Sequence, residues 1–229
     1  MAGKNRPTNG NDILTGNKAD NSIDGLGGDD IISGGEGKDR LSGNDGNDTL
    51  NGDNANDTLL GGAGSDTLNG GAGHDNLYGE DGNDTLSGGD GIDWLYGGAG
   101  ADVMAGGTGI DEFHYRSFSE SGGANVDTIN DYSLADGDLL LFLALDANAS
   151  AAGLQQWNYV EGLGVFQEGG NGQATLTYDA LSNTTTLNLY NNDGDSNVDF
   201  TVNFLGQYGP DDIQVTVFGG PGNIFDGII

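Results

Sequence analysis

The chain has 229 residues, of which 36 are acidic and only 6 basic, so its formal net charge is −30. This charge excludes nucleic acids and anionic lipid surfaces as natural partners, because both would repel the chain. There is no cysteine, which excludes disulfides and thiolate metal sites. No segment approaches the ~18 apolar residues of a membrane span, and no signal peptide is visible, so we expect no membrane insertion.

The chain divides into three segments. Residues 1–6 are short and polar, and we expect them to be a leader outside the fold. Residues 7–114 are twelve nine-residue units in direct succession, with the pattern G-G-x-G-x-D-x-(apolar)-x. Residues 115–229 lose the glycine period. We therefore expect a repeat domain followed by a C-terminal capping region.

Two positions of the unit are nearly invariant. Position eight is apolar in all twelve units, and position six is Asp in eleven of them, with Asn21 as the exception. The eleven aspartates are the predicted carboxylate ligands: Asp12, Asp30, Asp39, Asp48, Asp57, Asp66, Asp75, Asp84, Asp93, Asp102 and Asp111. A period of nine residues with this pattern is typical of a calcium-binding parallel β-roll. A flexible acidic linker would not preserve an apolar residue at every ninth position.

The unit predicts its own local structure. Glycine fills position one in eleven units and position four in ten, where we expect tight turning and positive φ. The residues after the Asp form a short strand with position eight facing inward. Two units then make one 18-residue turn, so odd and even units form opposite sheets. The prediction is an all-β, right-handed parallel β-roll of about six turns, followed by an antiparallel β cap.

Each turn buries only two apolar side chains, so the apolar core alone is too thin to order the loops. The position-six carboxylates of units n and n+2 should converge with loop carbonyl oxygens. Calcium takes 6–8 such oxygen ligands and tolerates irregular geometry better than magnesium. The predicted carbonyl ligands are Gly28, Gly35, Gly37, Asn44, Gly46, Asp53, Ala55, Gly62, Gly64, Gly71, Gly73, Glu80, Gly82, Gly89, Gly91, Gly98, Gly100, Gly107 and Gly109.

Charge sets an upper bound on the number of ions. Six loops on each edge leave five gaps per edge, which allows about ten calcium ions. Residues 7–114 carry 21 acidic and 3 basic side chains, a net charge of −18. Ten divalent cations would therefore bring the roll close to neutrality. The sites near Ala19 and Asn21 should be the weakest.

The two outer faces differ in character. The odd face carries a three-rung Thr-x-Asn ladder. It resembles the ladders of calcium-dependent ice-binding rolls but is short. The even face gathers aromatic residues near its C-terminal end. We expect the C-terminal region to fold back over this patch, and the alternative is a carbohydrate-stacking face. The patch consists of Tyr78, Trp94 and Tyr96, with His114 beyond them.

In the C-terminal half, residues 173–190 and 198–206 alternate at period two and predict antiparallel strands. Residues 179–183 should form the turn within the first segment, and residues 191–195 a hairpin loop. A short helix is predicted within Leu139–Leu145 and Ala147–Gln156. The larger apolar residues of this half would close the open end of the roll.

The nonapeptides resemble those of the repeats-in-toxin (RTX) proteins. The stretch GGTGIDEFHYRSFSESGGANVDTINDYSLADGDLLLF is similar to the junction in serralysin-type metalloprotease C-terminal domains and in alginate epimerase R-modules. VDFTVNFLGQYGPDDIQV resembles the serralysin C-terminal end, and the final Phe225–Ile229 resembles the acidic-then-hydrophobic ending of type I secretion passengers. The resemblance implies a calcium-loaded module of an exported bacterial exoprotein.

We therefore expect a noncatalytic, monomeric calcium-binding module that folds on extracellular calcium and supports type I secretion through its exporter. Two alternatives stay open: a module binding an extracellular, alginate-like polysaccharide, and a stand-alone secreted surface or matrix protein. The two histidines, His74 and His114, form no H-E-x-x-H motif, and neither G-x-S-x-G nor a P-loop is present. We expect no catalytic residue and no cofactor besides calcium.

Overall fold

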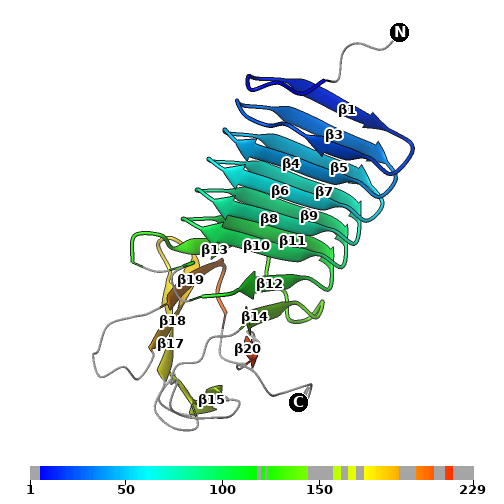
Figure 1. Ribbon diagram of the computed structural model, residues 1–229. Helices are drawn as coiled ribbons and strands as arrows, with labels where there is room; N and C mark the ends of the chain where they lie inside the picture. The colour runs from blue at the N-terminus through cyan, green and yellow to red at the C-terminus, as the bar shows by residue number, and fades with distance from the viewer. Residues whose placement is uncertain are drawn as a thin grey trace.

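The computed structural model describes residues 6–117, 120–121, 123–143, 157–160, 165–168, 173–190, 200–208 and 215–218. These residues form strands, bends and turns, and none of them lies in a helix. The described part of the chain therefore offers no helix that is long and apolar enough to cross a membrane. Two sheets face one another and are joined by loops along both edges, which is the predicted parallel β-roll (Figure 1).

Odd units build one sheet, which we call the odd sheet. It has 12 strands in the spatial order β1-β3-β5-β7-β9-β11-β13-β19-β18-β17-β16-β15. Its strands are β1 (Ile13–Asn17), β3 (Ile31–Glu36), β5 (Thr49–Asn54), β7 (Thr67–Gly73), β9 (Thr85–Gly91), β11 (Val103–Gly109), β13 (Asp127–Ile129), β15 (Trp157–Val160), β16 (Val165–Glu168), β17 (Gln173–Asp179), β18 (Thr184–Tyr190) and β19 (Phe200–Leu205).

Even units build the opposite sheet, the even sheet, which has 8 strands in the order β2-β4-β6-β8-β10-β12-β14-β20. Its strands are β2 (Ser22–Asp24), β4 (Arg40–Asp45), β6 (Thr58–Ala63), β8 (Asn76–Asp81), β10 (Trp94–Ala99), β12 (Glu112–Tyr115), β14 (Leu139–Leu143) and β20 (Val215–Phe218). Pairing within the roll is parallel and in register, so Leu50 lies opposite Leu68, and Leu59 opposite Leu77.

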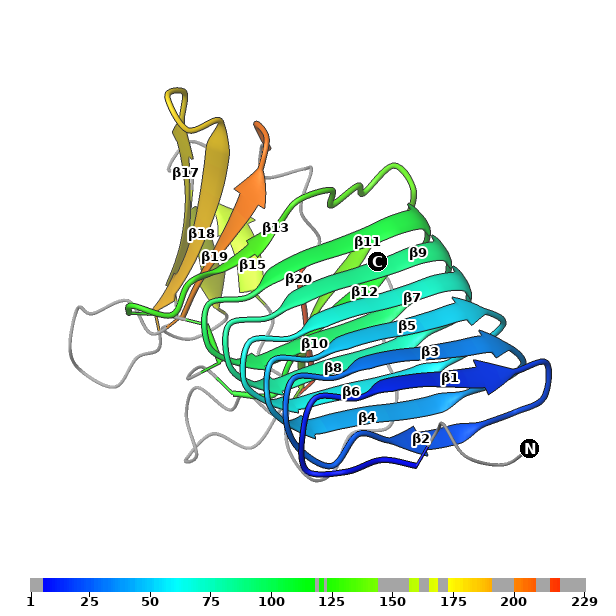
Figure 2. The same cartoon turned by 90° about the horizontal axis from the view of Figure 1, so that it is seen from above.

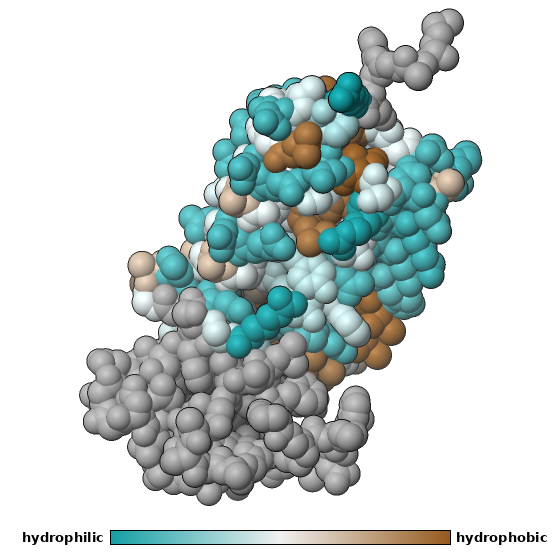
Figure 3. All heavy atoms as spheres, viewed as in Figure 1, coloured by the Kyte–Doolittle hydropathy of each residue, from teal (hydrophilic) through white to brown (hydrophobic). Residues whose placement is uncertain are grey.

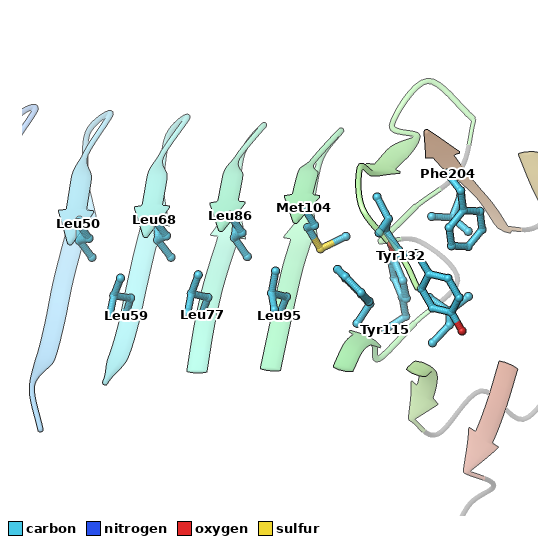
Figure 4. Packing of buried hydrophobic residues seen from close by; sticks show 14 of the residues in the cluster. Leu50, Leu59, Leu68, Leu77, Leu86, Leu95, Met104, Tyr115, Tyr132 and Phe204 are labelled. Carbon is cyan, nitrogen blue, oxygen red and sulfur yellow. The ribbon is translucent and has the colours of Figure 1, made fainter. Parts of the chain in front are cut away.

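Position eight forms the core, as predicted. Two rows of buried apolar side chains, one from each sheet, run along the roll and face each other (Figure 4). Leu50, Leu68 and Leu86 belong to one row, and Leu59 and Leu77 to the other (Figure 4). Because each turn adds one side chain to each row, the interior is only one residue deep on either side. The core is continuous but narrow.

The strands are longer than predicted, and the position-one glycines have a different role from the predicted one. β6, for example, runs from position seven of one unit to position three of the next. Positive φ occurs at positions two and four, as at Gly71 and Gly73, rather than at position one. The position-one glycine is instead the second inward-facing residue of the strand and is buried, as at Gly61 and Gly70. The expectation of positive φ at position one was therefore wrong, and steric crowding, described below, explains that glycine.

The sheets continue past the last repeat. β13 pairs in parallel with β11, and β14 with β12, so residues 127–143 form one further turn of the roll. β19 and β20 then pair in parallel with β13 and β14. From β19 the odd sheet turns antiparallel through β18, β17, β16 and β15. Figure 2 shows β17, β18 and β19 projecting beyond the end of the roll beside β13.

The antiparallel cap confirms the predicted hairpin, with a turn at residues 180–183 between β17 and β18. The helix predicted from Leu139 onward is wrong over the described residues, because Leu139–Leu143 is strand β14. In-register pairing with β12 places its apolar run against the end of the roll and overrides the local pattern. The predicted helix over 147–156, the hairpin loop at 191–195 and the terminal segment 225–229 lie outside the described residues.

Aromatic side chains close the C-terminal end of the roll. Tyr115, Tyr132 and Phe204 follow Met104 along the core axis (Figure 4). The Tyr132 ring meets Phe204 edge-on, with centroids 5.3 Å apart, and the Tyr208 hydroxyl donates to the Tyr132 carbonyl oxygen at 2.7 Å. These larger side chains cover the last apolar rungs, which a repeat of small residues would leave open to water.

Candidate calcium-binding edges

The position-six aspartates form two buried ladders, one on the odd edge, made by the loops of odd units, and one on the even edge. From Asp30 onward, each Oδ1 accepts a hydrogen bond from the backbone N–H of the ladder residue one turn earlier. Asp48 N–H donates to Asp66 Oδ1 at 2.7 Å, and Asp66 N–H donates to Asp84 Oδ1 at 2.8 Å. The predicted convergence of units n and n+2 is thus present, and one carboxylate oxygen per Asp is satisfied within the protein.

The second carboxylate oxygen has no such partner. In ten ladder aspartates Oδ2 is buried and accepts no hydrogen bond from the described residues. These are Asp30, Asp39, Asp48, Asp57, Asp66, Asp75, Asp84, Asp93, Asp102 and Asp111. Each of these side chains is at most 3% exposed. Buried polar atoms are almost always paired in native proteins, so a row of unpaired anionic oxygens indicates a ligand.

The position-one glycine shows where these oxygens point. A Cβ on Gly70 would lie 2.5 Å from Asp75 Oδ2 and 2.6 Å from the carbonyl oxygen of Gly88, one turn later. On Gly52 it would lie 2.5 Å from both Asp57 Oδ2 and the Gly70 carbonyl oxygen. A carboxylate oxygen and a carbonyl oxygen from the next turn therefore converge on one spot. Any side chain at position one would fill it.

Backbone carbonyls at positions two and four stack along both edges. All nineteen predicted carbonyl ligands have positive φ, and Leu26, which the sequence pattern did not single out, joins them. A Cβ on Gly62 would collide with the Asn44 carbonyl oxygen of the previous turn, and one on Gly64 with the Gly46 carbonyl oxygen. These carbonyls therefore face the next loop in the stack. Left-handed backbone is what turns them in that direction.

The donor set fits a hard cation. Among the described residues no three His, Asp or Glu side chains gather into a metal cluster. The sites offer instead one or two carboxylates per loop pair, together with backbone carbonyl oxygens. Such all-oxygen, carbonyl-rich sets suit calcium, which accepts 6–8 ligands in flexible geometry. The oxygen donors of these loops therefore fit the ligand preference of calcium.

Burial disfavours the charged form of the unpaired carboxylates. Desolvation is the largest influence and raises the pKa of Asp57, Asp66 and Asp93 to about 7, although the ladder N–H bond lowers it and neighbouring carboxylates raise it further. The same causes raise the pKa of Asp84 and Asp111 to about 6. A nearby cation would offset this cost, since it favours the charged form of every carboxylate it touches.

The N-terminal end of each ladder is different. Both the backbone N–H and the hydroxyl of Thr8 donate to Asp12 Oδ2, at 2.7 and 2.9 Å. Asn21, which replaces Asp on the even edge, accepts the Asn17 N–H at 2.7 Å through its side-chain oxygen. These two positions therefore lack the unpaired oxygen of the other ten. Asp12 lies where the pattern predicts, but its Oδ2 is satisfied locally by Thr8.

A second ladder, at position five, was not expected from the sequence. The Asn47 side-chain oxygen accepts the Ser65 N–H at 2.7 Å, and Asn83 does the same for Ala101 at 2.8 Å. His74 takes this role on the even edge, where its Nδ1 accepts the Ile92 N–H at 2.8 Å. The enrichment of Asn and Asp at position five was the available signal, and His74 therefore has a structural role here.

The aromatic patch on the even face is partly covered. Tyr78 and Tyr96 stack with ring centroids 4.7 Å apart, and Tyr96 stacks on His114 at 4.4 Å. The Arg116 guanidinium lies 4.4 Å from the Tyr96 ring centroid. His114, predicted to face outward, is buried, because Tyr96 lies on one side of it and β14 pairs with its strand on the other. Trp94 stays 43% exposed.

The face of the roll seen in Figure 3 is mostly hydrophilic. In Figure 3 teal residues cover most of the visible face of the roll, and the brown, hydrophobic areas are small and separate. Among the described residues, Trp94 is the one aromatic side chain in the set of exposed large hydrophobic residues.

Comparison with known proteins agrees with this geometry. The family model of the RTX calcium-binding nonapeptide repeat, in four copies, matches residues 7–41, 42–77 and 78–113. Residues 7–113 are therefore RTX calcium-binding repeats, a noncatalytic type of module. No curated protein sequence matches the chain.

The solved structures that match the chain include a distant likeness. It is the solution structure of the AlgE6R3 subunit from the Azotobacter vinelandii mannuronan C5-epimerase, which is 24% identical to this chain. The match covers 77% of this chain and 93% of that one, with a TM-score of 0.41. At this score the likeness carries no conclusion about what this chain binds.

Proposed function

We propose that this chain is a noncatalytic calcium-binding module whose roll folds only when calcium occupies its two edges. The ten buried Oδ2 atoms without a hydrogen bond are the observation that supports the proposal. Uncompensated buried carboxylates would oppose the compact state, and calcium bound to them would add its binding energy directly to folding. The fold would therefore depend on the ion.

In this proposal the aspartates from Asp30 to Asp111 are the carboxylate ligands, and the loop carbonyls at positions two and four are the neutral ones. Asp12 contributes weakly, because Thr8 already satisfies one of its oxygens. Ten gaps between stacked loops set the upper bound of about ten ions. Since residues 7–114 have a net charge of −18, full occupancy would leave the roll close to neutral.

Such a module suits an exoprotein. In a low-calcium cytoplasm the acidic repeats would repel each other and stay unfolded. Extracellular calcium modules typically bind with dissociation constants of about 10⁻⁴–10⁻³ M, so millimolar calcium outside the cell would fold and stabilise the chain. We propose on these grounds that the module acts outside the cell.

Far-UV circular dichroism against calcium concentration, at about pH 8, tests this proposal. We expect little roll structure in chelator and a cooperative gain of β signal with calcium. Asp66→Asn should raise the calcium midpoint, because it weakens one ladder site. Asp81→Asn removes the same charge from an exposed position-three side chain and should leave the midpoint near wild type. A strong roll signal in excess chelator would contradict the proposal.

A second candidate is polysaccharide binding on the even face. The observation that favours it is the exposed Trp94 ring, 5.7 Å from the His114 ring and on the same face as Arg116. Aromatic rings stack on sugars, and a guanidinium binds carboxylates bidentately. Calorimetry with alginate-like oligomers should show heat that Trp94→Ala abolishes. No heat at millimolar oligomer would remove this candidate.

A further inference from the structure

The odd-edge ladder does not stop with the last repeat. Residues 126–130, VDTIN, repeat positions five to nine of the nonapeptide, although the loop before them does not follow the pattern. Thr128 pairs with Val103, and its N–H donates to the Asp102 carbonyl oxygen at 2.7 Å. Ile129 is fully buried above Met104, at the position-eight place of the core. This segment therefore occupies the place of a thirteenth repeat unit.

Asp127 takes the position-six place in that rung. Its Oδ1 accepts the Asp102 N–H at 2.9 Å, as the odd-edge aspartates do from Asp30 onward. The side chain is completely buried, and Oδ2 accepts no hydrogen bond of good geometry from the described residues. The hydroxyls of Tyr115 and Ser121 interact with the carboxylate and lower its pKa, but burial outweighs them and raises it to about 8. Asp127 thus shares the buried, unpaired Oδ2 of the repeat aspartates and differs from them in the hydroxyls that interact with its carboxylate.

The even edge offers an internal comparison. There Asp138 follows Asp111, whose N–H donates to Asp138 Oδ1 at 3.0 Å. Asp138 Oδ2, however, accepts the Ser133 N–H at 2.7 Å. Both oxygens of Asp138 are therefore satisfied by the backbone. The two ladders therefore end differently. The last carboxylate of the even ladder, Asp138, has both oxygens hydrogen-bonded to the backbone, whereas Oδ2 of the last carboxylate of the odd ladder, Asp127, is unpaired.

We propose that Asp127, with Asp102 on the adjacent rung, binds one further calcium ion beyond the nonapeptide repeats, at the junction of roll and cap. Both carboxylates are buried, both have an unpaired Oδ2, and the Asp102 N–H bond to Asp127 joins the two rungs. The proposal rests on the proposed function, since it assigns the same ion to residues outside the repeat pattern.

The ladder ends one step later. Asp127 N–H donates to the Ser121 hydroxyl oxygen at 2.9 Å, so a hydroxyl replaces the next carboxylate. The Ser121 hydroxyl in turn donates to the Thr201 carbonyl oxygen on β19. Opposite Asp127 in β19 lies the apolar Val202. The ion would therefore be the last on the odd edge, and its ligand is hydrogen-bonded through Ser121 to the cap.

Two variants separate this site from the repeat sites. Calcium bound per chain is measured by equilibrium dialysis on full-length Asp127→Asn and Asp138→Asn, both of which keep the Oδ1 acceptor. We expect Asp127→Asn to hold one ion fewer than wild type and Asp138→Asn to hold the wild-type number. Equal numbers in all three proteins would overturn the assignment and leave Asp127 as a hydrogen-bonded end of the ladder.

A wild-type crystal grown with terbium in place of calcium covers the case in which Asp127→Asn does not fold. Anomalous density at bonding distance from Asp127 Oδ2 is expected, and its absence there, with density at the repeats, overturns only this inference. Absence of density along both ladders would instead refute the proposed function.

Discussion

A methyl group at position one tests whether the converging oxygens matter. Gly70 does not have the left-handed φ that penalises alanine, so Gly70→Ala adds only a Cβ. That Cβ would lie 2.5 Å from Asp75 Oδ2 and 2.6 Å from the Gly88 carbonyl oxygen, distances that real Cβ atoms essentially never show. The loop must shift or lose its ligand geometry. Overpacking of this kind costs about 1–3 kcal/mol.

The assay is thermal unfolding of the calcium-loaded protein, combined with a calcium count per chain. Gly70→Ala should lower the free energy of unfolding by about 1–3 kcal/mol and remove or weaken one ion. Gly27→Ala is the matched control, because its Cβ would meet nothing closer than the Asp45 carbonyl oxygen at 3.6 Å, an ordinary contact. If the two variants behave alike in stability and in bound calcium, the reasoning about position one is refuted.

Three further predictions follow from the same structure. In chelator, Asp57, Asp66 and Asp93 have a native pKa of about 7 against an ordinary 3.8, so the native state binds more protons between these values. Roll stability should therefore fall as pH rises from about 4 to 8, seen as a larger circular dichroism β signal in acid. Leu68→Ala should cost about 2–5 kcal/mol in calcium-loaded chemical denaturation, because Leu68 is buried in the one-residue-deep core. Glu80→Gly should raise the melting temperature by the equivalent of about 1 kcal/mol, since Glu80 has a φ of 74°.

Each of these has a result that contradicts it. A β signal in chelator that grows with pH would reverse the predicted sign for the carboxylates. Leu181→Ala, at a 99% exposed turn position, should change stability by less than about 0.5 kcal/mol, and an effect equal to that of Leu68→Ala would show that depth does not matter. Asp81→Gly removes the same charge one residue after Glu80 without a left-handed φ, so an equal gain there would exclude backbone strain as the cause.

The repeat pattern was sufficient to predict the roll. A period of nine with one inward apolar residue fixes two strands per turn, so the stacking of Leu50 on Leu68 and the Asp66–Asp84 contact both follow from the spacing alone. The sequence did not distinguish the two kinds of glycine. Position two carries Asn44, Asp53 and Glu80 despite positive φ, whereas a side chain at position one would meet the position-six carboxylate of its own unit as well as the next turn.

The C-terminal region was predicted less well because its partners are distant in sequence. Leu139–Leu143 has no strand alternation of its own and becomes β14 through in-register pairing with Glu112–Tyr115. Asp127 belongs to the odd ladder only because a loop of non-repeat length returns the chain to Asp102. The short DTIN match was the one sequence signal that Asp127 continues the ladder. The twelve uninterrupted units before it indicated instead that the roll ends at residue 114.

Hydrogen–deuterium exchange of the roll amides tests the central claim most directly, because it reports on the ladders themselves rather than on the cap. The amides of Asp48, Asp66 and Asp84 each donate to a ladder carboxylate in the folded roll. With millimolar calcium at about pH 8, we predict strong protection across residues 31–113. In excess chelator at the same pH, these amides should exchange at the rate of an unfolded chain. Equal protection in both conditions would show that the roll folds without calcium, and would contradict the account.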